Sequence, residues 1–343
     1  MKAAIQVEHD VPVAVSFVDT PVPGPTDVLV RVLACGLNHL DLWLRQGGTG
    51  DTLSLPRIPG TDVLGVVESV GTDVDGALIG RRVLLYPGQS CGQCEHCVFG
   101  HESACRGFKI LGYHVDGGYA ERVVVPENLL VPVPDNSLNW AAVPVAYITA
   151  WNALVAKGGL RAGQSIAIWG AAGGLGYAAL RIALALGADP VAIVGNTDKK
   201  VWLRSNGFEG HVVVRGKNVV QEVRAHTGKR GVDLVLDHVG AHTFNSSARM
   251  LATGGHLAFC GVTSGHLTEV DLRRIFGRQL SIAGTWMGNY ADLTAVVELL
   301  DGCPEAMPAV TAYFDLDEAA AAQDEMSCSE TAGKFMLVFK QQS

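Results

Sequence analysis

The sequence has no apolar run long enough to form a membrane span. Its most apolar stretch, Trp140 to Ala156, is broken by a proline and by polar residues, whereas a spanning helix needs about 20 predominantly apolar residues. The first ten residues lack the apolar core of a secretory signal and carry the polar run Glu8 to Asp10. We therefore expect a cytoplasmic protein with no membrane partner.

Positive charge is also scarce. The 26 Lys and Arg residues are outnumbered by 34 Asp and Glu residues, which gives a net charge of -8. Binding to nucleic acid draws much of its affinity from basic side chains that displace counterions from phosphates. This balance argues against a nucleic-acid partner and leaves a small-molecule substrate as the expectation.

The chain has no internal repeat and no low-complexity linker, yet its character changes near residue 140. Its 343 residues, at roughly 150 residues per domain, indicate about two domains. Before residue 140, short β-branched runs alternate with Gly, Pro and Asp turns, which is typical of a mostly β structure. These runs are Val28–Leu33, Gly65–Val70 and Arg122–Val125.

From Ser165 onward, apolar runs alternate with segments of helix length, a pattern that predicts a doubly wound parallel sheet in an α/β protein. The expected strands are Ser165–Trp169, Pro190–Val194, His211–Val214, Val232–Leu236, His256–Cys260 and Leu280–Gly284. Helices are expected at Leu175–Leu186, Asp198–Asn206 and Asn218–Thr227, each followed by a glycine that can end it. Near the end of the chain we expect a helix at Leu316–Met326 and a strand at Lys334–Phe339.

Four of the eight cysteines lie close together, at Cys91, Cys94, Cys97 and Cys105. Four thiolates at this spacing can close one tetrahedral zinc site, and a closed set of four ligands makes such a site structural. Two alternatives stay open at this point. The cysteines could form disulfides, or His96 or His101 could replace one of them as a ligand.

A glycine-rich turn follows the first expected strand of the second half, at residues 170–176. Such a turn lets the backbone approach a pyrophosphate, and the helix after it presents N–H donors. The residues expected to contact the cofactor here are Gly173, Gly174, Leu175 and Gly176. A tight turn without a ligand is the alternative interpretation.

The next strand ends without an acid of the kind that binds the ribose 2′-hydroxyl of NADH. Asn196 can donate a hydrogen bond there, and Lys199 or Lys200 can offer positive charge to a 2′-phosphate. This favours NADPH over NADH. If Asp198 instead serves as the ribose acid, the lysines are only a solvated start of a helix.

Two further segments, residues 34–41 (ACGLNHLD) and 59–65 (PGTDVLG), complete the pattern. Together with the cysteine cluster and the glycine turn, they closely resemble the medium-chain dehydrogenase/reductase superfamily over essentially the whole chain. The resemblance implies a GroES-like, mostly β catalytic domain at residues 1–140 and 288–343, with a zinc lobe at about 88–108. It implies a Rossmann dinucleotide-binding domain at residues 141–287, and hence one structural zinc ion and a nicotinamide cofactor.

The resemblance also bears on catalytic zinc. Alcohol dehydrogenases of this family hold that ion with Cys, His and Cys, and the matching positions here are Asn38, Thr61 and Val145. Asn, Thr and Val cannot supply a comparable zinc site. The positions of the family's proton relay hold Leu40 and Trp43. The chain is therefore similar to the metal-free quinone oxidoreductase and enone reductase branch, although many members of that branch lack the four-cysteine lobe.

Roles for single residues follow from this resemblance. Asn38 is the first candidate to donate a hydrogen bond to the substrate oxygen, where negative charge develops, and Asp41 is an orienting acid more than a base. Thr149 matches a threonine that contacts the nicotinamide. Weaker candidates for a proton donor are Tyr86, Tyr113 and Tyr147, and further cofactor contacts are expected at His39, Gly240, Gly261 and Lys334.

Three functions compete on this evidence. The first is NADPH-dependent hydride transfer to a quinone or an α,β-unsaturated carbonyl without catalytic zinc. The second is an alcohol or aldehyde oxidoreductase that uses the same hydride but a different polarising group, and the third is a nucleotide-binding or structural protein without turnover. Two zinc ions per chain would instead indicate a catalytic site rebuilt from Cys35, His39 and Asp62. The resemblance further implies a homodimer, or a homotetramer, that pairs through Leu280–Gly284.

Overall fold

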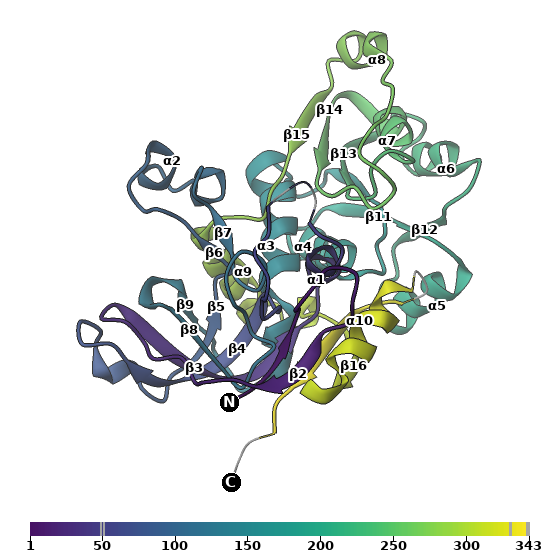
Figure 1. The fold of residues 1–343 in the computed structure, drawn as a ribbon. Helices are drawn as coiled ribbons and strands as arrows, with labels where there is room; N and C mark the ends of the chain where they lie inside the picture. Colours follow the sequence, from purple (N-terminus) through teal and green to yellow (C-terminus); the bar gives the residue numbers. More distant parts are fainter. Residues whose placement is uncertain (49, 51, 329–330, 341–343) are drawn as a thin grey trace. The chain divides into compact units, whose positions relative to one another are not determined.

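A computed structural model describes residues 1–48, 50, 52–328 and 331–340 (Figure 1). The chain divides into two compact units. Unit 1 comprises Met1–Ala146, Asn289–Asp301 and Pro308–Ser343, and unit 2 comprises Tyr147–Gly288 and Gly302–Met307. The sequence analysis expected boundaries at 140/141 and 287/288 and assigned all of residues 288–343 to the first domain, whereas Gly302–Met307 belongs to unit 2.

Unit 1 is built on a seven-stranded sheet in which β3 (Asp27–Gly36) pairs with three neighbours. The strand order is β16-β17-β3-β4-β5-β9, and β8 pairs with β3 outside this path. The pairs are antiparallel except β16 with β17. The remaining strands are β4 (Asp62–Val70), β5 (Arg82–Leu85), β8 (Arg122–Pro126), β9 (Leu130–Pro132), β16 (Val310–Phe314) and β17 (Lys334–Val338).

The mostly β character of this half was predicted from its β-branched runs, and the structure confirms it. Every residue of β3 from Val32 to Gly36 is buried, as expected for a central strand whose apolar side chains pack on both faces. Smaller elements complete unit 1. They are β1 (Lys2–Ile5), β2 (Ala14–Phe17), α1 (His39–Arg45), β6 (Gly88–Gln89), α2 (Glu95–Val98), β7 (Lys109–Ile110) and α10 (Ala319–Ser327).

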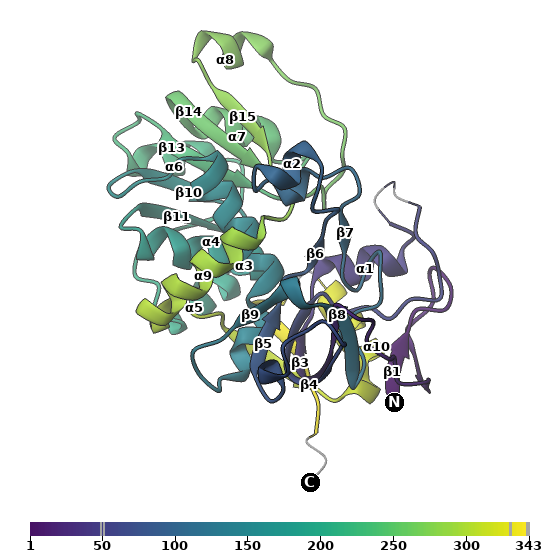
Figure 2. The same ribbon diagram turned by 90° about the vertical axis from the view of Figure 1, so that its left-hand side faces the viewer.

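Unit 2 contains a six-stranded sheet in the order β12-β11-β10-β13-β14-β15, with every pair parallel. Figure 2 labels the neighbouring strands β11, β10 and β13 of this sheet. The order reverses between β10 and β13, which creates the switch point where α/β sheets bind ligands. The strands are β10 (Ser165–Ile168), β11 (Asp189–Val194), β12 (His211–Val214), β13 (Val232–Asp237), β14 (Leu251–Phe259) and β15 (Ser281–Gly284).

Helices alternate with these strands, as the sequence predicted. They are α4 (Gly174–Ala185), α5 (Thr197–Ser205), α6 (Val219–His226), α7 (Phe244–Met250) and α8 (Leu272–Gly277). The glycines predicted to end α4, α5 and α6 all have positive φ, for example 73° at Gly187, a conformation that glycine adopts without strain. The core between sheet and helices is formed by aliphatic side chains such as Val191, Ile193 and Leu257.

The apolar stretch near residue 140 forms several short helices. A 3₁₀ turn at Leu138–Ala142 precedes α3 (Pro144–Trp151), which continues as a π-helical segment at Asn152–Lys157. The α-helix not yet described, α9 (Tyr290–Gly302), lies almost entirely in unit 1. In the described part of the chain, none of these helices is long and apolar enough to cross a membrane.

Candidate active site and metal centre

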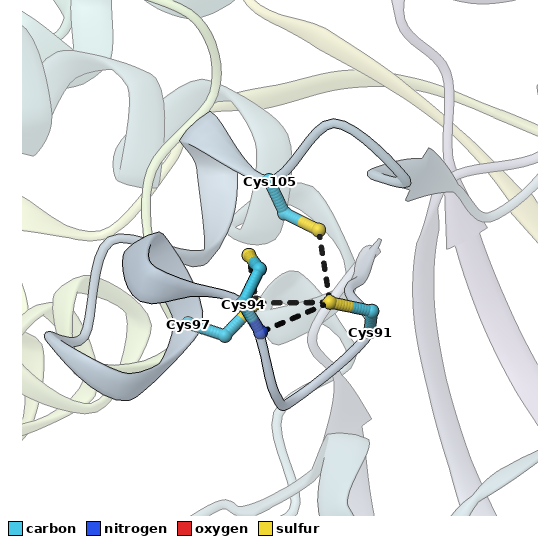
Figure 3. A group of neighbouring side chains, drawn as sticks. All are labelled: Cys91, Cys94, Cys97 and Cys105. Carbon is cyan, nitrogen blue, oxygen red and sulfur yellow. Dashed lines mark hydrogen bonds between the residues drawn. The ribbon is translucent and has the colours of Figure 1, made fainter.

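Four cysteines gather on the lobe that carries α2 (Figure 3). The sulfur atoms of Cys91, Cys94, Cys97 and Cys105 all lie within 4.8 Å of one another. The Sγ–Sγ distances are 3.9 Å for Cys91 and Cys97, 3.5 Å for Cys94 and Cys97, and 3.6 Å for Cys105 and Cys91. Tetrahedral zinc with Zn–S bonds of about 2.3 Å separates its sulfur ligands by about 3.8 Å.

Backbone N–H groups donate to two of these sulfurs, while burial and the neighbouring cysteine side chains raise the pKa of Cys94 to about 11. The backbone N–H of Cys94 donates to Cys91 Sγ at 3.4 Å, and that of Gly107 donates to Cys105 Sγ at 3.3 Å. Backbone N–H groups of Gln93 and Cys94 lower the pKa of Cys91 to about 6. No cysteine of the described chain forms a disulfide. The geometry therefore fits one structural zinc ion with four cysteine ligands, as predicted.

The glycine turn of unit 2 brings the start of α4 very close to the end of β10. A Cβ atom at Gly176 would lie 2.2 Å from the carbonyl oxygen of Gly170, so only glycine fits there. Gly173 is the residue before the first turn of α4, which contains Gly174, Leu175 and Gly176. The N–H groups of a first helical turn have no partner within the helix and can bind a phosphate. The arrangement fits the pyrophosphate of a dinucleotide.

At the end of β11, the residues predicted to select the cofactor lie at the start of α5. Asn196 is the N-cap residue, and its Oδ1 accepts a hydrogen bond from the backbone N–H of Lys199 at 2.9 Å. The Asn196 side chain is exposed, whereas Lys199 and Lys200 are partly buried. Asp198 is exposed in the first turn of the helix.

Arg215 is a candidate that the sequence analysis missed. It follows β12 directly, its N–H donates to the carbonyl oxygen of Val194 at 2.8 Å, and its Nε lies 3.9 Å from a Cβ built on Gly195. The exposed guanidinium therefore stands beside the strand end where a 2′-phosphate would bind. The available signal was an arginine placed one residue beyond the neighbouring strand.

Gly240 and Gly261 were predicted to allow close approach, and in the structure their close neighbours belong to the chain itself. A Cβ at Gly240 would lie 2.7 Å from the carbonyl oxygen of Gly265, and one at Gly261 would lie 3.0 Å from that of His238. Burial lowers the pKa of His238, and its Nε2 lies 2.8 Å from the carbonyl oxygen of Trp169. These loops after β13 and β14 are thus held by backbone packing.

In unit 1, the three positions that the sequence analysis matched to catalytic zinc ligands lie next to Asp62 or to Lys334, with which Asp62 pairs. Asp62 Oδ1 accepts a hydrogen bond from the backbone N–H of Val145 at 2.7 Å, and Thr61 precedes Asp62 in the chain. Lys334 Nζ lies 3.0 Å from Asp62 Oδ2 and 2.7 Å from Asn38 Oδ1. Asn38, Thr61, Asp62 and Lys334 are all at most 9% exposed.

Two polar atoms of this group have no hydrogen-bond partner among the described residues, namely Asn38 Nδ2 and Thr61 Oγ1. A buried polar group without a partner costs free energy and calls for an explanation such as a bound ligand. Within the described chain, the four-cysteine cluster is the one group of at least three Cys, His or acidic residues placed to hold a metal. The residues around Asn38 do not fit a zinc ion, and neither does the set Cys35, His39 and Asp62.

Lys334 was predicted to face the cofactor, and the structure places it differently. Its ammonium group donates to the carbonyl oxygen of Leu37 at 2.6 Å, to Asn38 Oδ1 and to Asp62 Oδ2. An ammonium group has three N–H donors, so none remains for a phosphate. Lys334 belongs to the buried polar group of unit 1.

Asp41 connects the start of α1 to the turn before β4. Its carboxylate accepts hydrogen bonds from the N–H of Asn38 at 2.8 Å, the N–H of Gly60 at 3.3 Å and the hydroxyl of Tyr119 at 3.1 Å. Burial raises the pKa of Asp41 to about 6, against the opposing effect of the hydrogen bonds from Asn38 and Tyr119. These contacts are those of an orienting residue.

The three tyrosines proposed as acids are buried and lie in separate surroundings. The hydroxyl of Tyr147 donates to the carbonyl oxygen of Ala306 at 2.6 Å, and burial raises its pKa. Tyr86 packs edge-on against Tyr290, and burial raises its pKa as well. Tyr113 is fully buried against His114. A raised pKa makes a phenol a weaker acid, which argues against Tyr147 and Tyr86 as the proton donor.

Two predicted cofactor contacts remain. Thr149 is 8% exposed within α3. His39 is exposed at the first position of α1, with its ring edge-on to Trp43 at a centroid distance of 6.0 Å. Burial holds the pKa of the Cys35 thiol above its ordinary value, so Cys35 is a neutral core residue.

Comparisons with known proteins agree with this architecture. Residues 24–135 match the alcohol dehydrogenase GroES-like domain family, and residues 174–302 match the zinc-binding dehydrogenase family. The NAD-dependent alcohol dehydrogenase of Sulfolobus acidocaldarius is 31% identical over 98% of this chain and 99% of that protein. The quinone oxidoreductase of Mus musculus is 28% identical over 94% of this chain and 92% of that protein.

A solved structure titled NAD-dependent alcohol dehydrogenase is also similar, with a TM-score of 0.94 and 35% identity over 99% of this chain and 100% of that one. These matches define an oxidoreductase with a GroES-like domain and a Rossmann domain. The chain belongs to the medium-chain dehydrogenase/reductase superfamily. The predicted fold class and the structural zinc lobe are thereby confirmed.

Proposed function

We propose that this chain is an NADPH-dependent reductase that transfers hydride to a quinone or an α,β-unsaturated carbonyl without catalytic zinc. The observation that carries the proposal is the unpartnered Asn38 Nδ2, buried at a position where zinc relatives have a metal ligand. A carboxamide N–H can stabilise an oxygen that gains negative charge, which is the task that zinc performs in the related alcohol dehydrogenases.

The chemistry divides between the cofactor and the residues of the chain. When bound at the switch point of unit 2, NADPH supplies a hydride equivalent. Asn38 Nδ2 donates a hydrogen bond to the carbonyl or quinone oxygen of the substrate as charge develops on it. A proton from water then completes the reduction to a saturated carbonyl compound or a hydroquinone. Thr61 Oγ1, the second unpartnered atom, offers another donor beside Asp62.

The test measures NADPH oxidation with 2-cyclohexen-1-one and with 1,4-benzoquinone, each with and without EDTA. We expect turnover that EDTA does not change over minutes. Removing one oxyanion donor lowers kcat by about 10²–10³-fold in other enzymes, so Asn38→Ala is expected to fall in that range. Asn136→Ala, a change of an exposed asparagine in the same unit, is the matched control. Full activity of Asn38→Ala would contradict the proposal.

Alcohol or aldehyde oxidation is the second candidate, and the similarity to structures and proteins named alcohol dehydrogenase favours it. It predicts NAD(P)⁺ reduction with a primary alcohol such as ethanol and rapid loss of that activity with EDTA. Turnover of the alcohol without turnover of the enone or the quinone would support this candidate over the first. NADPH binding without reduction of any acceptor would leave a nucleotide-binding protein.

A further inference from the structure

The buried ammonium of Lys334 determines which way the Asn38 side chain points. Lys334 is 6% exposed, and its Nζ lies 2.7 Å from the Asn38 side-chain oxygen. An ammonium can donate hydrogen bonds but cannot accept them. The amide atom that faces Lys334 is therefore the oxygen Oδ1, and the nitrogen Nδ2 must point to the other side.

The remaining contacts of Lys334 hold this arrangement in place. Its other two N–H groups are taken by the carbonyl oxygen of Leu37 at 2.6 Å and by Asp62 Oδ2 at 3.0 Å. The Asp62 carboxylate balances the charge of Lys334, and its second oxygen is bound by the backbone N–H of Val145 at 2.7 Å. With all three donors used, the ammonium has one geometry, and the amide it holds has one orientation.

The cost of this arrangement falls on one atom. Asn38 Nδ2 is buried with no hydrogen-bond partner among the described residues. Rotating the amide by 180° would not give it a partner, because it would then face the Lys334 ammonium. That rotation would bring an N–H group against an ammonium and lose a charge-assisted hydrogen bond, the stronger kind. The ion pair thus maintains an unsatisfied donor that only an added acceptor can satisfy.

We infer that Lys334 is a positioning residue, which fixes the Asn38 amide so that Nδ2 is the donor to the substrate oxygen and polarises that N–H through the amide. The inference rests on the proposed function, since it assigns Asn38 Nδ2 to the substrate. It gives Lys334 a role through Asn38 and no direct contact with the substrate or the cofactor.

The kinetic test is a double-mutant cycle with 2-cyclohexen-1-one and NADPH. We expect Lys334→Met to lower kcat by about 10–100-fold, the range expected for one charge-assisted hydrogen bond, with the KM for NADPH unchanged. In the Asn38→Ala background, Lys334→Met should have no further effect on kcat, because it acts through the missing amide. Lys2→Met, which removes a half-buried lysine paired with Asp317, is the control and should leave activity unchanged.

Two further variants keep the test decisive, because removing one partner of a buried ion pair can prevent folding. Lys334→Arg retains the charge and should recover part of kcat. The double variant Lys334→Met with Asp62→Asn removes both charges and should show the same low kcat as Lys334→Met. An additive loss of kcat in the Asn38→Ala background, or a raised KM for NADPH, would overturn the inference.

A measurement without turnover separates this inference from the proposed function. In a ¹⁵N NMR spectrum, the side-chain NH₂ signal of Asn38 is identified as the one lost in Asn38→Ala. We expect Lys334→Arg and the double variant to move this signal and Lys2→Met to leave it in place. If the signal moves but no acceptor is reduced, the positioning role stands and the proposed function fails. If the signal does not move, the positioning role is wrong.

Discussion

At the residue scale, the buried carboxylate of Asp41 joins the start of α1 to the turn before β4 through hydrogen bonds. It receives three hydrogen bonds, from α1, from the turn at Gly60 and from Tyr119. Gly60 itself has φ of 99°, and a Cβ there would lie 2.8 Å from the backbone nitrogen of Tyr119. Asp41 therefore fixes the segment that begins with Asn38.

The raised pKa of Asp41 predicts a stability that depends on pH. The folded-state pKa is about 6, above about 3.9 in an unfolded chain. Its contribution to stability is fully present below about pH 4 and is lost as the pH rises through 6. Asp41→Asn stays uncharged, so we expect wild type to lose about 3 kcal/mol relative to it between pH 4 and pH 7.

Urea unfolding at pH 4, 5, 6 and 7 measures this difference. Asp19→Asn, a change of an exposed acid, is the control and should run parallel to wild type. If the Asp41→Asn curve is also parallel to that of wild type across this range, Asp41 does not titrate as described.

Arg215 carries a prediction about the choice of cofactor. An arginine next to the end of β11 can bind a 2′-phosphate, which only NADPH has. We expect Arg215→Ala to raise the KM for NADPH by about 10-fold or more, equivalent to one charged hydrogen bond, and to leave the KM for NADH almost unchanged. Arg161→Ala, at the amino end of β10, is the control.

Lys199→Ala combined with Lys200→Ala tests the competing basic residues named from the sequence. A fall in NADPH affinity in that variant, with none in Arg215→Ala, would return the role to the lysines. Equal effects of Arg215→Ala on both cofactors would remove the argument for NADPH at this position.

Some residues of the site could be predicted from the sequence, and others depend on contacts that only the folded chain makes. The zinc site and the candidate donor Asn38 could be predicted from the sequence, because each prediction depends on residue types at fixed positions along the chain. The contact of Lys334 with Asn38 joins residues 296 positions apart and depends on the pairing of β17 with β3. Arg215 was missed for the same reason, since its neighbour Gly195 follows a different strand, β11.

At the element scale, the strands of the parallel sheet could be predicted from the sequence, whereas two of the helices between them could not. All six strands of unit 2 were located from their apolar runs. In inner strands such as β10 the run is continuous because both faces are buried. β14 begins at Leu251, five residues before the predicted start at His256, since two glycines interrupt its apolar pattern. The helices α7 and α8 were not predicted, because their seven and six residues are too few to show a period.

The zinc lobe is the element whose prediction can be tested most directly. We expect elemental analysis to find one zinc ion per chain and Cys105→Ser to lose it, because three ligands no longer close the site. The Tm should fall by about 5 °C or more, since 1 kcal/mol corresponds to about 2–4 °C for a domain of 150–250 residues. Cys303→Ser, outside the cluster, is the control and should keep the metal. Two zinc ions per chain would contradict a metal-free reaction.

At the scale of the whole molecule, the described sheet of unit 2 has two edge strands, β12 and β15, and apolar side chains are exposed at the β15 edge. β15 is the last strand in the order, and its Ile282 is 43% exposed. The helix α8 just before it exposes Leu272 at 70% and Phe276 at 74%. An open edge with apolar residues nearby is suited to pairing with a second copy about a two-fold axis.

We therefore predict a homodimer in which two β15 strands pair, giving a particle of twice 36.2 kDa by light scattering. A lysine at an interface core is unfavourable because its charge loses water, so Ile282→Lys should shift the equilibrium toward the single chain. Val201→Lys, on the exposed side of α5 at 57% exposure, should not change the mass. If the wild-type protein is a single chain, or if Ile282→Lys dimerises with unchanged affinity, this edge is not the interface. If the wild-type mass is that of four chains and Ile282→Lys halves it, the tetramer has a second interface elsewhere.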